Sequence, residues 1–94
     1  MLQFTKLNKQ NPDKRETGKR KGDFKEIYDE FINDKATEQS SRCSQCGVPF
    51  CQIHCPLSNN IPDWLKLTAE GRLKEAYELS QSTNNMPEVC GRIC

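Results

Sequence analysis

Residues 43–56 have the sequence CSQCGVPFCQIHCP, in which four cysteines fall within thirteen positions. We call this stretch the cysteine run, and its cysteines are Cys43, Cys46, Cys51 and Cys55. Two more, Cys90 and Cys94, follow about 35 residues later in the sequence CGRIC. Thiolates are soft ligands that suit iron and zinc, so the sequence first of all predicts a metal-binding domain.

The spacing C-x2-C-x4-C-x3-C-P indicates iron–sulfur ligation. It resembles the C-x2-C-x2-C-x3-C-P run of bacterial ferredoxins, with one loop two residues longer. Cys43, Cys46 and Cys51 are close enough in sequence for one loop to present three sulfurs to one cluster. In two-cluster ferredoxins the fourth cysteine of the run ligates the other cluster, and by this analogy Cys55 is directed elsewhere.

Two other uses of the cysteines stay open at this point. Zinc could bind Cys43, Cys46 and two further ligands, and the thiols could also pair as disulfides. Zinc sites typically use two separated ligand pairs, whereas the x4 and x3 gaps lie within one run, which favours an iron–sulfur cube. We predict that His54, next to Cys55, is a partly exposed loop residue and not a ligand.

The composition limits what else the chain can do. It has 94 residues, 34% of them hydrophobic, and a mean hydropathy of −0.86. A chain with so little apolar surface needs a metal, disulfides or a partner to stabilise it. The net charge of +1 suggests neither nucleic acid nor an anionic membrane as a partner.

The cellular location of the protein is predicted from the absence of membrane-spanning and secretory-signal segments in the sequence. It has no run of 18 apolar residues that could span a membrane and no apolar secretory signal at its start. We therefore expect a cytoplasmic protein. In that reducing compartment, clustered cysteines are more often metal ligands or redox groups than structural disulfides.

The first third of the chain divides into a charged arm and a predicted helix. Residues 1–22 are rich in charge and interrupted by proline and glycine, so we expect an arm that is poorly ordered in isolation. The domain proper is predicted to cover residues 23–94. Its first helix is predicted from an apolar stripe with helical spacing and Asp23 as N-cap; the stripe consists of Phe24, Ile27, Tyr28, Phe31 and Ile32.

The rest of the chain is also predicted to be helical. A short helix starts near Thr37, and the cysteine run is expected to lack regular structure. Asn60 is a plausible N-cap for the next helix, Gly71 should end it, and a further helix continues to about Ser80. A turn at 83–87 then brings Cys90 back toward the run. No stretch alternates long enough for a strand, so the predicted fold class is all-α around metal.

The chain resembles the N-terminal domain of the small (β) subunits of bacterial NADPH-dependent glutamate synthases. The same module occurs in dihydropyrimidine dehydrogenase and related NAD(P)H oxidoreductases. The resemblance rests on the order of three features: the cysteine run, NIPDWL at residues 60–65, and PEVCGRIC at residues 87–94. It covers about residues 24–94.

The resemblance implies a small helical domain of the two-cluster type, holding two low-potential 4Fe–4S clusters. It assigns Cys43, Cys46 and Cys51 to the first cluster. It assigns Cys55 and Cys94 to the second. Cys90 matches a position that is not usually a ligand. Family members continue with further cluster ligands and with FAD- and NADPH-binding domains, so we expect this chain to be truncated at its C-terminal end.

The implied function is electron transfer from NADPH and FAD toward the large (α) subunit, the expected partner, which forms glutamate. No Ser/His/Asp set, phosphate loop or G-x-G-x-x-G motif occurs, so no catalytic residue and no FAD or NADPH site is expected within these 94 residues. Two alternatives remain: a small subunit of dihydropyrimidine dehydrogenase or a related oxidoreductase, and a zinc-stapled interaction domain without a redox role. The Trp64-Leu65 pair and the sequence of 87–92 favour glutamate synthase.

Overall fold

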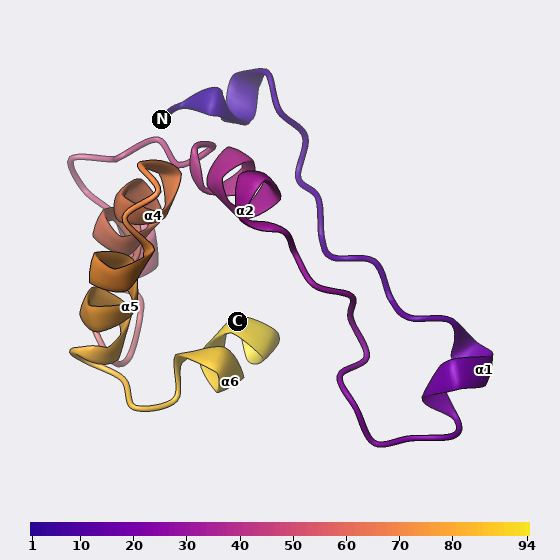
Figure 1. The fold of residues 1–94 in the computed structure, drawn as a ribbon. Coiled ribbons are helices and arrows are strands. Elements are labelled where there is room, and N and C mark those ends of the chain that lie inside the picture. Colours follow the sequence, from indigo (N-terminus) through magenta and orange to yellow (C-terminus); the bar gives the residue numbers. More distant parts are fainter.

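The computed structural model describes residues 1–94, and its regular structure is entirely helical (Figure 1). The four longer helices are α2 (Asn33–Ser40), α4 (Ile61–Ala69), α5 (Leu73–Gln81) and α6 (Pro87–Ile93). Three shorter ones are η1 (Gln3–Thr5), α1 (Thr17–Arg20) and α3 (Phe50–Ile53). The β-type pairing is limited to an isolated antiparallel bridge between Lys14 and Tyr28. The prediction of an all-α fold is confirmed.

Helices α2, α4 and α5 form the packed part of the molecule. A three-residue turn joins α4 to α5, the two helices pack against each other, and α2 packs against α4 (Figure 1). Four of the 94 residues are buried, and the apolar ones among them are Pro62 of α4 and Ala76 of α5. So small a core supplies little hydrophobic stabilisation, which agrees with the need for a metal or a partner inferred from composition.

Helix α4 begins and ends where the sequence predicts. Asn60 is its N-cap residue and Pro62 occupies the first turn. The asparagine side chain does not cap the helix, however, because its Oδ1 accepts a hydrogen bond from Gln52 Nε2 at 2.7 Å. This bond attaches α3 of the cysteine run to the start of α4.

Gly71 ends α4 in a left-handed conformation with a φ of 76°. The Gly71 N–H donates to Thr68 O at 3.1 Å, and the Arg72 N–H donates to Leu67 O at 2.9 Å. These two bonds form a Schellman motif, which satisfies carbonyls that the end of a helix leaves free. The motif sharply reverses the chain so that α5 can pack on α4.

Residues 24–32 do not form the predicted amphipathic helix. Phe24, Ile27 and Ile32 are exposed and Phe31 is half-buried, so the stripe does not form one packed face. A helix of about ten residues is marginal unless its apolar face is packed, and here the backbone pairs elsewhere. The Arg15 N–H donates to Ile27 O at 2.8 Å, and the Asp29 N–H donates to Asp13 O at 2.8 Å.

Asp23, the predicted N-cap of that helix, instead holds a turn. Its carboxylate accepts two hydrogen bonds from the Arg15 guanidinium, at 2.7 and 3.1 Å, and one from the Lys25 N–H at 3.0 Å. The guanidinium of Arg15, as hydrogen-bond donor, lowers the pKa of Asp23. The short helix predicted near Thr37 starts earlier, at Asn33, because no proline or glycine interrupts the polar stretch 33–42.

The first ten residues lie along α2 and the start of the cysteine run. The Leu2 N–H donates to Cys43 O at 2.7 Å, and the Gln3 N–H donates to Ser41 O at 3.0 Å. Arg42 Nε donates to Leu7 O at 2.9 Å. The N-terminal segment therefore covers the backbone of the first predicted ligand, while the division of the chain at residue 22 stays a prediction.

Helix α6 stands apart from the α4–α5 hairpin and is tied to the segment before α2 (Figure 1). The Arg92 guanidinium donates to both carboxylate oxygens of Glu26 and to Glu88 Oε1. The hydrogen bond from Arg92, together with backbone N–H donors from Tyr28 and Ile27, lowers the pKa of Glu26 to about 2. None of the helices is long and apolar enough to cross a membrane.

We expect Gly71→Ala to destabilise the protein by about 1 kcal/mol, because an L-residue is strained in the left-handed region. A Cβ at Gly71 meets nothing within 4 Å, so the effect isolates the backbone strain. Gly91→Ala is the matched control, since a Cβ there also meets nothing and Gly91 lies within α6 with an ordinary φ. Thermal unfolding followed by circular dichroism measures both. If Gly71→Ala is as stable as the unaltered protein or more stable, the left-handed conformation of Gly71 is contradicted.

We expect the contact between α6 and Glu26 to be lost only at strongly acidic pH. The pKa of Glu26 in the folded protein is lowered from 4.5 to about 2, so the contact stabilises the fold above pH 4.5 and is lost as the pH falls through about 2. A nuclear magnetic resonance titration of the Glu26 carboxyl measures this. A Glu26 midpoint near 4.5 contradicts the ion pair with Arg92.

Candidate metal centre

All six cysteines are free thiols in the structure. Cys46, Cys51 and Cys94 are exposed, whereas Cys43, Cys55 and Cys90 are half-buried. Four of them lie on the connection between α2 and α4, and the last two lie on α6 and at its end. The disulfide alternative is therefore not realised.

The first pair of cysteines lies on a turn that Gln45 shapes. Gln45 has a left-handed backbone with a φ of 51°, between Cys43 and Cys46. Its Nε2 donates to Cys43 Sγ at 3.3 Å and to Pro62 O at 2.7 Å. One amide therefore contacts the first predicted ligand and attaches the turn to the start of α4.

Cys51 lies within α3, a turn of helix that the sequence analysis did not predict. Pro49 precedes α3, and its carbonyl accepts hydrogen bonds from the Gln52 and Ile53 N–H groups, both at 3.0 Å. Proline is favourable at a helix start because it has no N–H to satisfy there. His54 ends α3 as an exposed residue, and its ring stacks on Phe50 at a centroid distance of 5.8 Å.

Cys55 is surrounded by N–H donors. Ser58 has a left-handed backbone with a φ of 52°, which folds the following residues back toward the sulfur. The backbone N–H of Asn59 has the largest effect in lowering the pKa of the Cys55 thiol, followed by that of Leu57. These donors favour the thiolate, which is the form that binds metals.

Cys90 and Cys94 lie one helical turn apart. The Cys94 N–H donates to Cys90 O at 2.9 Å, which places the two side chains on neighbouring positions of one helix face. Asn84, which is buried, donates from Nδ2 to Cys90 Sγ at 3.2 Å, and its Oδ1 accepts the Met86 N–H at 3.0 Å. The sulfur of Cys90 is thus engaged within the chain, whereas Cys94 is exposed.

The structure does not bring three or more His, Cys, Asp or Glu side chains close enough to hold a single metal ion. It gathers neither Cys43, Cys46 and two further ligands nor Cys43, Cys46 and Cys51 around one point. A 4Fe–4S cube makes a different demand, since each thiolate binds a different iron atom. Free thiols, several of them accepting N–H donors, have the donor chemistry that such a cluster requires.

The amide side chains of Gln45, Asn59 and Asn84 are residues that the sequence analysis missed. Each donates to a cysteine sulfur: Gln45 to Cys43, Asn59 to Cys55 at 3.4 Å, and Asn84 to Cys90. The available signal was an amide residue within two to six positions of a cysteine. That signal is weak, because the chain holds other asparagines and glutamines that contact no sulfur.

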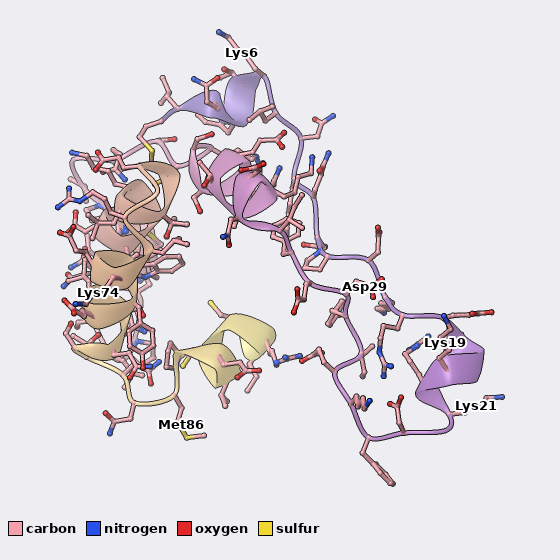
Figure 2. All side chains as sticks on the ribbon, in the orientation of Figure 1. Lys6, Lys19, Lys21, Asp29, Lys74 and Met86 are labelled. Atoms are coloured by element: carbon pink, nitrogen blue, oxygen red, sulfur yellow. The ribbon has the colours of Figure 1, made fainter.

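Basic side chains occur in several parts of the molecule. Lys6, Lys21 and Lys74 project from three separate parts of the molecule (Figure 2). The expectation that nucleic acid is not a partner stays a prediction.

Comparison with known proteins places the site in a family context. Residues 20–94, which include all six cysteines, match the family described as dihydropyrimidine dehydrogenase domain II, 4Fe–4S cluster. The whole chain is 66% identical to part of the glutamate synthase (NADPH) small chain of Azospirillum brasilense and 50% identical to part of that of Escherichia coli. A third, from Bacillus subtilis, is 39% identical over 97% of the chain. The chain spans about a fifth of the length of these relatives.

Proposed function

Because the chain belongs to the 4Fe–4S family of dihydropyrimidine dehydrogenase domain II, we propose that it is the electron-transfer domain of an NADPH-dependent glutamate synthase small chain. The observation that carries the proposal is that the family match, from residue 20 to residue 94, contains the whole cysteine run and both later cysteines. The zinc-stapled alternative is set aside, because the family is one of iron–sulfur domains.

The proposal assigns the cysteines to two clusters. Cys43, Cys46 and Cys51 hold the first, and Cys55 and Cys94 contribute to the second. A bound cluster supplies one-electron transfer. The protein residues hold the thiolates in position: Gln45 anchors the first turn to α4, and the N–H groups around Ser58 face the Cys55 sulfur.

The remaining ligands, FAD and NADPH are assigned by the proposal to parts of the small chain outside these 94 residues. Electrons from NADPH and FAD then pass through this domain toward the large (α) subunit, where glutamate forms. Residues 1–22 are proposed as an N-terminal arm and residues 23–94 as the cluster-binding domain. Six free thiols suit a reducing compartment, so we place the protein in the cytoplasm.

The relatives support glutamate synthase over dihydropyrimidine dehydrogenase as the parent enzyme. Three relatives matched over nearly the whole chain are named glutamate synthase small chains. The direct test is to combine the full small chain with its large subunit and measure NADPH oxidation coupled to glutamate formation. NADPH oxidation that depends on a pyrimidine, with no glutamate formed, favours the dihydropyrimidine dehydrogenase alternative.

We expect the full small chain, purified without oxygen, to contain about eight iron atoms, since two 4Fe–4S clusters hold four each. Cys43→Ser, Cys46→Ser or Cys51→Ser should each remove about half of this iron, because the first cluster loses a thiolate. Iron and acid-labile sulfide analysis measures the content. Unchanged iron in all three variants means that the ligand assignment is wrong.

We expect Cys94→Ala to lose the second cluster and Cys90→Ala to keep it. The resemblance assigns Cys94, and not Cys90, to the second cluster. In the structure Cys94 is exposed, and the Cys90 sulfur is half-buried and accepts the Asn84 amide. Loss of that sulfur should cost only about 1 kcal/mol of stability. Electron paramagnetic resonance of the reduced full-length variants measures cluster content. Equal cluster loss in both variants refutes the distinction.

A further inference from the structure

The side chain of Asn59 lies between a predicted cluster ligand and a distant hydroxyl group. Its Nδ2 donates to Cys55 Sγ at 3.4 Å, and its Oδ1 accepts a hydrogen bond from Thr83 Oγ1 at 2.6 Å. Asn59 follows the cysteine run by three residues, and Thr83 lies on the connection between α5 and α6. The nitrogen of this amide therefore donates to a cysteine sulfur, while its oxygen accepts from a hydroxyl group.

We propose that Asn59 is a positioning residue that raises the reduction potential of the second cluster, and that Thr83 holds its amide with the N–H toward the Cys55 sulfur. The proposal rests on the proposed function, because it takes Cys55 as a ligand of a 4Fe–4S cluster. It goes beyond that function by naming residues that control how readily the site accepts an electron.

The chemistry of the three groups permits one productive arrangement of the amide. A thiolate only accepts hydrogen bonds, so the NH2 group must face Cys55 and the carbonyl must face away. Thr83 then meets a carbonyl oxygen, to which its hydroxyl donates. Without this hydroxyl the amide loses one of the two contacts that fix its orientation, so its N–H group is held less firmly toward the sulfur.

Hydrogen bonds to ligand sulfurs are among the factors that set iron–sulfur potentials. Reduction adds negative charge, part of which resides on the ligand sulfurs, and hydrogen bonds to a charged acceptor are stronger than those to a neutral one. The Asn59 donor therefore stabilises the reduced state more than the oxidised state. Removing the donor lowers the potential.

Two similar amides do not have the same arrangement. Gln45 uses the same nitrogen for Cys43 Sγ and for Pro62 O, and its shorter bond of 2.7 Å is the one to the carbonyl. Asn84 donates to Cys90, which the proposed function does not use as a ligand. Among the three amides, Asn59 is the one whose nitrogen donates to a ligand sulfur while its oxygen accepts a hydrogen bond from another side chain.

The contact with Thr83 also connects the two parts of the chain that supply the second cluster. Thr83 lies 24 residues from Asn59 and precedes α6, the helix that leads to Cys94. One hydrogen bond thus ties the surroundings of Cys55 to the segment that carries the other assigned ligand. A change at Thr83, which touches no cysteine sulfur, is predicted to act on the potential through Asn59.

The test is a redox titration of the full small chain, purified without oxygen and followed by electron paramagnetic resonance. At a fixed ambient potential, Asn59→Leu should lower the ratio of reduced to oxidised second cluster about tenfold, which is 59 mV for a one-electron couple. Asn59→Asp should lower it further, because a carboxylate oxygen faces the sulfur. Thr83→Val should lower the potential of the second cluster by a smaller amount. Thr83→Ser, which keeps the hydroxyl, should leave that potential unchanged.

Asn85→Leu is the matched control, since Asn85 is exposed, lies on the same connection as Thr83 and contacts no sulfur. It should leave both potentials unchanged, and the first cluster should keep its potential in every variant. If Asn59→Leu prevents assembly of the second cluster, Thr83→Val decides by its potential. Loss of the cluster in Thr83→Val as well overturns the proposal, because the contact is then structural.

Different results would refute the proposed function and the role of Asn59. Absence of iron and of any paramagnetic signal from the unaltered protein refutes the proposed function. Two intact clusters, with unchanged potentials in both Asn59→Leu and Thr83→Val, refute only the role of Asn59. A shift shared by the first cluster also refutes it, because such a shift reports a general change in the fold.

Discussion

The molecule buries very little apolar surface, so hydrophobic packing contributes little to its stability. The other features of the structure depend on this constraint. Four residues are buried, and the apolar ones among them are Pro62 and Ala76. Large apolar side chains such as Phe24, Phe50 and Ile93 are exposed. A small domain with so little core is commonly stabilised by a metal, disulfides or a partner, so cluster binding and folding are expected to be coupled.

The α4–α5 hairpin provides the frame on which the cysteine run is held. Two side-chain contacts attach the run to the start of this frame, Gln45 to the Pro62 carbonyl and Gln52 to Asn60. A third, Asn59 to Thr83, ties the segment after the run to the connection between α5 and α6. They act close to Cys43, Cys51 and Cys55 respectively. Polar contacts therefore do much of the positioning that apolar packing performs in larger domains.

Prediction from the sequence succeeded where short-range chemistry decides the outcome. Gly71 ends α4 because glycine adopts the left-handed conformation at little cost, and Pro62 is compatible with the first turn of a helix. It failed for the apolar stripe of residues 24–32. Periodicity specifies which residues share a helix face, but the helix is stable only if another surface covers that face, and residues 13–15 offer backbone pairing instead.

The sequence by itself determined the number and spacing of the thiols, the all-helical class and the membership in a 4Fe–4S family, because these depend on residue type and on separations of a few positions. Only the tertiary structure decided which groups surround the sulfurs. Gln45 meets Pro62 across 17 residues and Asn59 meets Thr83 across 24. Such partners are chosen by how the run folds onto the α4–α5 hairpin, since a hydrogen bond requires its two atoms to meet in space and no local pattern encodes that meeting.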